Sequence, residues 1–380
     1  MVDGARLDHI CEPELRFVRV LRGEGMGMLR PDEGATEDDA ALKLVGVGAS
    51  PYTRKLRAAL RYRRVPYHFV VAGSVEANAL PDRPLPLVPY LVLPGADGAP
   101  ATAMSDTTPI LDHLERTVPE RRLRPSDPAL RLIDLLLEDY GDEWLSKCMF
   151  HYRWSYAPDT RKASAYLPYA RAMQMTREEG RDAENAFARR QISRIGVVGS
   201  NPITAPVIEE SWRRYLEIFE AHIQNQPYLL GHRPGAGDFA CYGQMTMLVI
   251  TDPTPAQIAL EVSPRAYAWT ERLEDVSGLE VSEGDWIDLA SPPSTLRDLL
   301  CEVGRVYAPF MVGNAVAVAR GADQVACEID GKPWVQEPFV YQAKCLRWLR
   351  AAYSALEPSD RRRVDQLLEG TGCEPLFAQA

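Results

Sequence analysis

No stretch of this 380-residue sequence approaches the roughly 18 consecutive apolar residues that a membrane-spanning helix requires. Asp3, Arg6, Asp8 and Glu12 interrupt any apolar segment at the N-terminus, so no secretory signal is expected. The composition is also unbiased, with 46% hydrophobic and 25% charged residues, which is typical of globular proteins. We therefore expect a cytoplasmic protein that does not contact membranes, and the length allows two or three domains.

The sequence also lacks the cysteine and histidine patterns of metal sites and disulfide frameworks. Its seven cysteines contain no CxxC pair, and its six histidines form no HxH or HxxxH pattern. Unpaired thiols fit the reducing cytoplasm. The sequence thus predicts a protein without a metal ion.

An excess of positive charge is missing as well, because the formal net charge is −10. An acidic chain repels nucleic acid and anionic membranes, so neither is an expected partner. Two short basic clusters, Arg61–Arg64 and Arg361–Arg363, lie in amphipathic sequence and are interpreted as solvated helix faces.

The residue pattern of the sequence changes three times, and these changes divide the chain into four segments. An irregular leader is expected over 1–41, and a small α/β domain over 42–117. Prolines follow in 118–128, and the pattern is then helical over 126–280. The remaining residues, 281–380, form a C-terminal extension of mixed α+β pattern and unknown role.

The α/β segment alternates strand-like and helical patterns. Four short apolar runs predict strands at Leu44–Val47, Pro66–Val71, Val88–Leu93 and Ala101–Met104. One helix is expected to begin at Ser50-Pro51 and a second at Thr108-Pro109, because serine and proline are favoured at those first positions.

The extension has equally clear local signals. Leu296–Val318, Tyr341–Leu356 and Arg361–Leu368 have helical patterns. Val325–Gln336 predicts two strands around the turn Asp330-Gly331. Its Trp286, Trp334 and Trp348 are expected in the core.

Four motifs in order resemble the glutathione transferases over about residues 43–275. These are Ser50-Pro51-Tyr52-Thr53-Arg54-Lys55, Val88-Pro89-Tyr90, Asp106-Thr107-Thr108-Pro109-Ile110, and Tyr228-Leu229-Leu230-Gly231 with Asp238-Phe239. The resemblance implies a thioredoxin-like domain that holds glutathione, followed by an all-α domain that shapes the pocket for a second substrate. It also implies a cis-proline at Pro89 and a homodimer.

Ser50 is the first candidate for contact with the glutathione sulfur. The N-terminus of a helix carries partial positive charge, and a serine hydroxyl there can donate to a thiolate. Capping of its own helix is the alternative role for Ser50. Tyr52 is the second candidate donor, although packing explains it better. A serine at position 50 cannot form a mixed disulfide, which disfavours glutaredoxin-like chemistry.

The other predicted ligand contacts follow from the resemblance. The backbone of Val88, exposed by Pro89, is expected to pair with the cysteinyl part of glutathione. Asp106 is expected to bind the α-ammonium of its γ-glutamyl end, and Thr107 the α-carboxylate. N-capping is the alternative role of this segment, but it explains only one of its residues.

Two further features receive a structural or an open interpretation. Asp238 is predicted to be structural, because Gly235 stands where the family has a capping serine or threonine. The aromatic cluster Phe150, Tyr152 and Trp154 could line the pocket for an electrophilic substrate or pack between helices.

The sequence therefore predicts an enzyme that binds glutathione as co-substrate, stabilises its thiolate and promotes attack on a small electrophile. A glutathione-dependent isomerase or dehalogenase is an alternative, since the same thiolate would add and later leave. A non-catalytic binding or assembly protein with the transferase fold is another, and the long extension favours it.

Overall fold

The structure is a computed structural model that describes residues 41–95 and 99–378. Apart from residue 41, the predicted leader lies outside the described residues. The described part contains no helix with the length and apolar character needed to cross a bilayer.

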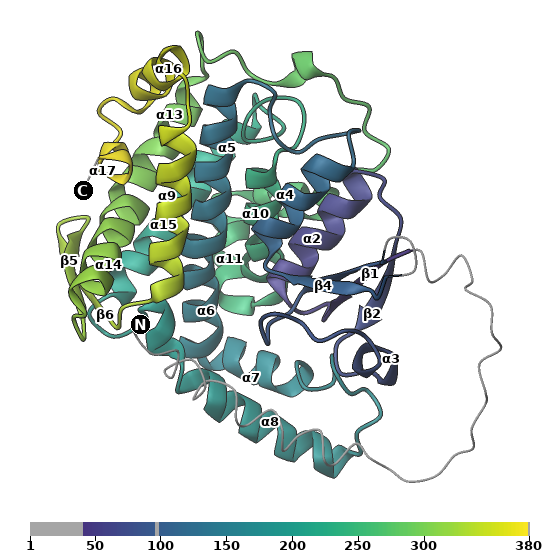
Figure 1. Cartoon of the computed structure of the whole chain (residues 1–380). Helices are drawn as coiled ribbons and strands as arrows, with labels where there is room; N and C mark the ends of the chain where they lie inside the picture. Colours follow the sequence, from purple (N-terminus) through teal and green to yellow (C-terminus); the bar gives the residue numbers. More distant parts are fainter. Residues whose placement is uncertain (1–40, 96–98, 379–380) are drawn as a thin grey trace.

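A four-stranded mixed sheet forms the N-terminal part (Figure 1). Its strands are β1 (Leu42–Gly46), β2 (Tyr67–Val71), β3 (Tyr90–Leu93) and β4 (Thr102–Ser105), in the spatial order β2-β1-β3-β4. β1 is parallel to β2 and antiparallel to β3, and β3 is antiparallel to β4. The predicted order of strands is confirmed, and this is the thioredoxin-like arrangement.

Helices cover both faces of this sheet. α2 (Pro51–Tyr62) and α4 (Thr107–Thr117) lie between the sheet and the helical domain, and α3 (Val75–Asn78) lies on the other face (Figure 1). Ser50 caps α2 by accepting a hydrogen bond from the Thr53 N–H at 3.4 Å. Proline at the first position needs no donor, so this local sequence begins a helix directly after β1.

The second domain is helical. Its elements are α5 (Pro128–Tyr140), the π-helical η4 (Gly141–Leu145), α6 (Ser146–Ser155), α7 (Ala157–Tyr166), α8 (Arg177–Ile192), the 3-10 turn η5 (Ile195–Val198), α9 (Ala205–Ile223), α10 (Ala236–Met245), the π-helical η6 (Thr246–Thr251), α11 (Pro253–Val262) and α12 (Pro264–Leu273). α10 packs closely on α2, because a Cβ at Gly243 would lie 2.7 Å from the Pro51 carbonyl oxygen.

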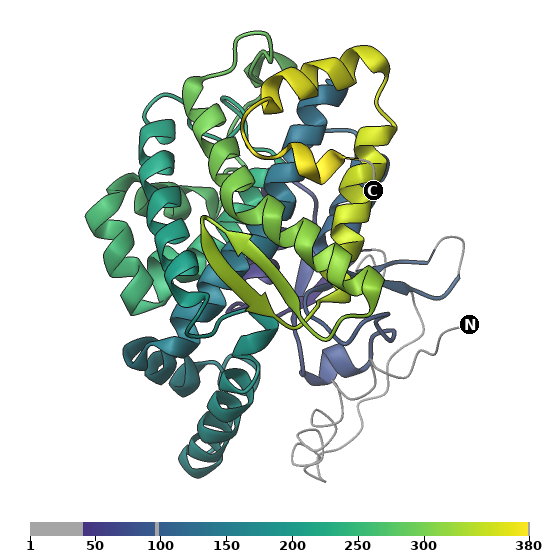
Figure 2. The same ribbon diagram turned by 90° about the vertical axis from the view of Figure 1, so that its left-hand side faces the viewer.

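The extension adds helices and one hairpin on the side of the helical domain away from the sheet (Figure 2). After the 3-10 turn η7 (Glu283–Asp285) come α13 (Ser294–Glu302), the π-helical η8 (Val303–Tyr307), α14 (Ala308–Arg320), β5 (Val325–Ile329), β6 (Lys332–Gln336), α15 (Val340–Ser354), α16 (Pro358–Leu368) and α17 (Glu374–Phe377). The predicted hairpin is confirmed, and Asp330 and Gly331 form its turn with φ of 53° and 69°.

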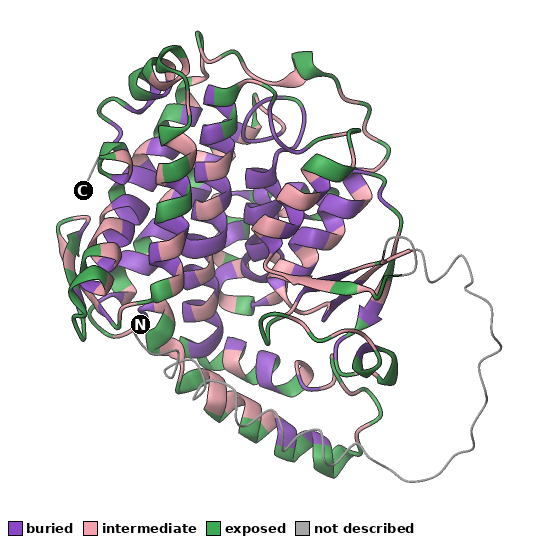
Figure 3. Cartoon of the chain, viewed as in Figure 1, coloured by how far each residue is buried: buried purple, intermediate pink, exposed green. Residues whose placement is uncertain are grey.

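One buried cluster runs through the helical domain and the extension (Figure 3). Trp144 of η4 packs against Trp334 of β6 with 5.4 Å between the ring centroids and a tilt of 39°, and both side chains are fully buried. Burial of an aromatic side chain stabilises the fold by about 1.5–3 kcal/mol. The extension therefore shares the core of the helical domain instead of forming a separate one.

Two expectations about individual side chains are wrong. The cluster Arg61–Arg64 is not a solvated helix face throughout, because the Arg63 side chain is buried and pairs with Glu115 at 2.7 Å. Trp348 is 39% exposed and is not a core residue, whereas Trp334 is. In both cases the sequence pattern predicts a helix but does not show which other segment packs on each of its faces.

Candidate functional site

The sheet register brings three of the predicted motifs to one edge. Val45, Tyr90 and Ser105 are partners across β1, β3 and β4. β1 and β4 therefore end beside the point where β3 begins. Ser50 follows β1, Asp106 follows β4, and Val88–Pro89 precedes β3, so these segments lie at the same edge of the sheet.

Two helix N-termini point toward this edge. Ser50 is the N-cap of α2, and Asp106 occupies the N-cap position of α4. Helix N-termini present unpaired N–H groups and partial positive charge, which favour bound anions. This edge can thus hold a thiolate and a carboxylate at two separate points.

The conformation of Asp106 is unusual. Its φ of 79° with ψ of 125° is a region that non-glycine residues rarely adopt. Its side chain makes no capping hydrogen bond to α4. The Oδ2 atom instead accepts a hydrogen bond at 2.7 Å from the Tyr341 hydroxyl, which comes from α15 of the extension. Capping alone therefore does not explain Asp106, and backbone strain of this kind is concentrated at functional sites.

Val88 and Pro89 stand just before β3, and their peptide bond is cis. Thr107 is buried, and its Oγ1 accepts a hydrogen bond at 3.2 Å from the Lys55 ammonium. That bond joins the second turn of α2 to the first turn of α4. It fixes the two helix N-termini relative to each other.

Lys55 is the centre of a buried ion-pair network. Its Nζ lies 2.7 Å from Glu138 Oε1 and 2.5 Å from Asp142 Oδ2. Burial alone lowers the pKa of Lys55, but the two carboxylates outweigh it and raise that pKa above its usual value. Burial raises the pKa of Glu138, yet Arg124 and Lys55 bring it down to about 2. Both Lys55 and Glu138 therefore remain charged inside the protein at neutral pH.

A cavity of about 390 Å³ lies next to the start of α4. Thr108 and Pro109 form one side, and α15 closes the cavity with residues such as Tyr341. Between them, α5 contributes Glu138 and Asp139, and η4 contributes Asp142 and Glu143. Most of the carboxylates here belong to one helical stretch, where the π-turn shifts Asp142 and Glu143 out of the regular α-helical position. The extension thus builds part of the wall of this cavity. The cavity lies beside the predicted contacts, because none of them is among its lining residues: Ser50, Val88, Pro89, Asp106 and Thr107.

Two segments match the family models "Glutathione S-transferase, N-terminal domain", over residues 44–122, and "Glutathione S-transferase, C-terminal domain", over residues 205–275. These two segments are therefore similar to the N-terminal and the C-terminal domain of the glutathione S-transferase family. No curated protein matches the sequence.

Solved structures that are similar to this chain share little of its sequence. A glutathione transferase family member from Pseudomonas fluorescens pf-5, with two glutathione bound, is 12% identical, covers 70% of this chain and 94% of its own, and has a TM-score of 0.40. A Burkholderia graminis glutathione transferase, with two glutathione molecules bound per subunit, is 13% identical, with 68% and 88% covered and a TM-score of 0.38. The beta-etherase LigF from Sphingobium sp. strain SYK-6 is 19% identical, with 61% and 94% covered and a TM-score of 0.40.

The hydroxyl of Tyr52, the second candidate donor, already makes a hydrogen bond within the protein. Its hydroxyl donates to the Asp142 carbonyl oxygen at 2.9 Å, across the contact between the two domains. Burial and the nearby Glu143 and Asp142 raise the pKa of Tyr52 well above its usual value. Of the two candidate hydroxyl groups, that of Ser50 is therefore better placed to donate to a bound thiolate.

The three predicted pocket aromatics lie in α6 and do not line the cavity beside α4. Tyr152 is buried and stacks on Tyr156 at 5.4 Å, and Phe150 packs against Trp154 at 6.2 Å. Trp154 also packs against Phe187 of α8, at 5.9 Å. These contacts favour the packing interpretation over the substrate pocket.

Asp238 acts as predicted, as an element of the fold. Its Oδ2 accepts from the Gly235 N–H and its Oδ1 from the Leu229 N–H, each at 2.9 Å. Gly235 offers no side chain in return, so only half of a capping box is present. Asp238 thereby fixes the loop before α10 to the start of that helix.

The sequence reasoning missed two residues of the site, Lys55 and Tyr341. A lysine between Tyr52 and Ala59 on the apolar face of a helix is a signal that could have identified Lys55 as buried. Nothing in the sequence near Tyr341 points to Asp106, 235 positions away. Among the described residues, no group of three or more His, Cys, Asp or Glu side chains is arranged to hold a metal ion.

Glu143 should make the stability of the protein depend on pH. Burial and Asp139 raise its pKa to about 8 in the folded state, compared with about 4.3 in an unfolded chain. Between these values the folded state binds more protons, so the free energy of unfolding falls as the pH rises. Replacing Glu143 with Gln should remove this dependence. Between pH 5 and pH 8, the free energy of unfolding of the variant should rise relative to that of the wild type by up to about 1.4 kcal/mol per pH unit.

Urea unfolding of both proteins at pH 5, 6, 7 and 8 measures this difference. Titrating groups far from Glu143 are present in both proteins and cancel. Asp139 and Lys147 interact with Glu143 by charge, so the measured difference also includes their response to its replacement. A difference that stays constant over this range would show that Glu143 is already ionised in the folded protein.

Proposed function

We propose that this chain binds glutathione at the sheet edge formed by Ser50, Val88–Pro89 and Asp106–Thr107, and that it activates the glutathione thiol for attack on a small electrophile. One observation carries the proposal. The register of β1, β3 and β4 gathers these segments at one edge, and the Lys55–Thr107 hydrogen bond holds two helix N-termini beside each other.

In this proposal Ser50 faces the sulfur. Its Oγ accepts the capping hydrogen bond from the Thr53 N–H, and its hydroxyl proton can be donated to a thiolate. The N-terminus of α2 adds favourable electrostatic interaction with that negative charge. Together they lower the thiol pKa, so that more of the reactive thiolate is present at neutral pH. The protein itself supplies no covalent nucleophile.

The opposite end of the tripeptide would lie at the start of α4. The Asp106 carboxylate suits the α-ammonium, and the N–H groups of the first turn suit the α-carboxylate. In this arrangement the ligand ammonium shares Asp106 with the Tyr341 hydroxyl. The positioning of both ends fixes the sulfur for attack.

Replacing Ser50 with Ala should leave glutathione binding within about threefold but lower the conjugation rate about 100-fold, as the loss of one donor to a developing anion does in other enzymes. Calorimetry measures the binding, and turnover of a chlorodinitrobenzene-type electrophile measures the rate. Ser74→Ala is a matched control, because Ser74 caps α3 by accepting from the Ala77 N–H at 3.1 Å. If millimolar glutathione showed no measurable binding to the wild type, the proposal would be wrong.

The same assay tests the finer parts of the function. Consumption of glutathione indicates conjugation, whereas its regeneration indicates isomerisation or a related reaction. Light scattering on the purified chain tests the homodimer that the resemblance implies.

A non-catalytic binding protein is the second candidate, and the Tyr341–Asp106 hydrogen bond favours it. In that case the extension would occupy the ligand position permanently. The absence of both glutathione binding and electrophile turnover, in the wild type and in Tyr341→Phe, would support this candidate.

A further inference from the structure

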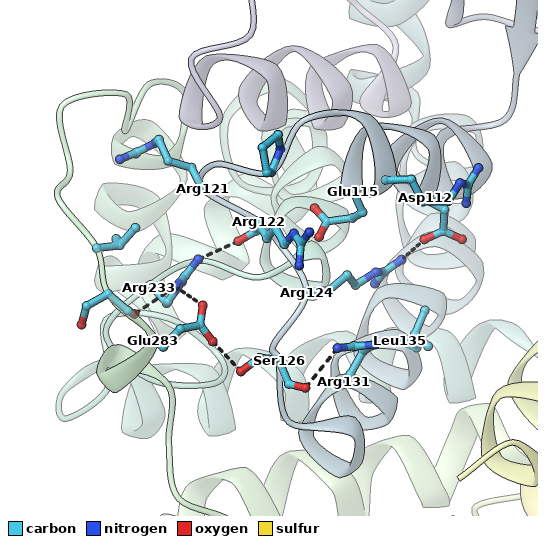
Figure 4. Close-up of a pocket in the computed structure, with 14 residues that line it drawn as sticks. Asp112, Glu115, Arg121, Arg122, Arg124, Ser126, Arg131, Leu135, Arg233 and Glu283 are labelled. Carbon is cyan, nitrogen blue, oxygen red and sulfur yellow. Dashed lines mark hydrogen bonds and ion pairs between the residues drawn. The ribbon is translucent and has the colours of Figure 1, made fainter.

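A second cleft, of about 800 Å³, lies at the other end of α4 (Figure 4). It is formed by the end of α4, the linker before α5, the first turns of α5 and the segment 281–283. Its lining includes six arginines: Arg116, Arg121, Arg122, Arg124, Arg131 and Arg233. This concentration of one cationic side chain stands out in a protein whose net charge is −10.

The carboxylates that line this cleft are already paired. Asp112 pairs with Arg124 at 3.2 Å, Glu115 with the buried Arg63 at 2.7 Å, and Glu283 with Arg233 at 3.0 Å. None of the three is therefore left to neutralise the other arginines of the cleft.

Four of the arginines have no carboxylate partner among the described residues. Arg121 donates to backbone carbonyl groups, among them Leu279 at 2.7 Å, and Arg131 donates to those of Pro125 and Ser126. Such bonds fix a guanidinium in place but leave its charge uncompensated. Burial is the main cause that lowers the pKa of Arg121; the positive charges of Arg64 and Arg233 add to it, and Tyr62 and Glu280 oppose it.

Arg116 and Arg122 are exposed at the cleft, and within the described part of the chain their side chains make no hydrogen bond or ion pair. A purely structural role explains Arg121, Arg124, Arg131 and Arg233, which tie the linker to its neighbours. It does not explain why two further arginines without partners face the same cavity.

We propose that this arginine cleft binds a small, multiply charged oxyanion, such as a phosphate ester or a polycarboxylate. Guanidinium groups bind such oxygens in bidentate geometry, and fixed ones lose little entropy on binding. The volume is that of a typical small-molecule site and suits a compact anion. The cleft is separate from the proposed glutathione site, but Asp112 and Arg116 line both cavities, so α4 forms a common wall.

Calorimetry on the full chain tests the site with two probes, inorganic pyrophosphate and citrate. We expect saturable binding of one anion per chain for at least one probe, and the probe that binds more tightly identifies the oxyanion type. The double variant Arg116→Gln/Arg122→Gln should weaken this binding roughly tenfold or more, because it removes two charge-assisted contacts. Both positions are exposed, so the variant should fold.

The matched control is Arg320→Gln/Arg347→Gln, which removes the same charge from two exposed arginines outside the cleft. It should leave the affinity within about twofold, since distant surface charges are screened. An equal loss in both double variants would indicate unspecific attraction and overturn the proposal, as would the absence of saturable binding of either probe at millimolar concentration. The assay contains no glutathione, so its result is independent of the proposed transferase function.

Discussion

Replacement of Lys55 with Met should lower the free energy of unfolding by about 3–5 kcal/mol, the cost of removing one partner from a buried ion pair. Lys55 is fully buried, and Glu138 and Asp142 depend on it for charge compensation. Methionine has a similar shape, so the loss reflects the carboxylates more than a cavity: Asp142 loses its cation, and Glu138 keeps only its pair with Arg124, at 2.5 Å. Urea unfolding at pH 7 measures the change.

Two further variants test whether the loss of stability comes from the buried charges. Lys332→Met removes the lysine of an exposed pair with Glu210 and should cost less than about 1 kcal/mol. Adding Asp142→Asn to Lys55→Met should recover part of the lost stability, because the carboxylate that has lost its cation is then gone. A loss below about 1 kcal/mol in Lys55→Met alone would show that the network does not hold the two domains together.

The proposed function predicts a second large effect, on glutathione affinity. Asp106→Asn should weaken binding about 10- to 100-fold, since a hydrogen bond to a charged group contributes about 1.5–3 kcal/mol. Asparagine retains an oxygen that can accept from the Tyr341 hydroxyl, so the contact with the extension should survive. Calorimetric titration with glutathione measures the change.

Tyr341→Phe should act in the opposite direction and strengthen glutathione binding about two- to fivefold, because it frees the Asp106 carboxylate from a competing neutral hydrogen bond. Tyr353→Phe is the matched control on the same helix, where the hydroxyl donates to Asp365 at 2.6 Å. Equal affinities of wild type, Asp106→Asn and Tyr341→Phe would place the ligand elsewhere.

The extension has a structural consequence that follows from these contacts. α15 supplies Tyr341 to Asp106, and the Nε2 of its Gln342 donates to Glu143 Oε2 at 2.8 Å. Trp334 of the hairpin packs against Trp144 of η4. Removal of residues 281–380 would thus expose core surface and open the cavity beside α4. Any activity of the chain should be measured with the extension present.

Local signals were enough to predict much of the fold. Ser50-Pro51 begins a helix because capping and a fixed φ act within one turn, and the Asp330-Gly331 turn sets the register of its hairpin over two residues. The order of strands and helices over 42–117 follows from such short-range preferences together with hydrophobic periodicity. The Ser50 and Asp106 segments could be proposed as a site because their motifs resemble those of the glutathione transferases and each stands at the junction of a strand and a helix.

Only the tertiary structure decided which side chains meet. Lys55 finds its carboxylates 83 and 87 positions away, and Tyr341 reaches Asp106 across 235 positions, distances over which sequence spacing carries no information. The burial of Arg63 and the convergence of arginines at the end of α4 are decided in the same way. The sequence by itself determined the elements, the thioredoxin-like order and the candidate helix N-termini, because those depend on local backbone preferences. The charge pairing, the closed wall of the cavity and the role of the extension depend on packing between distant segments, which only the folded chain specifies.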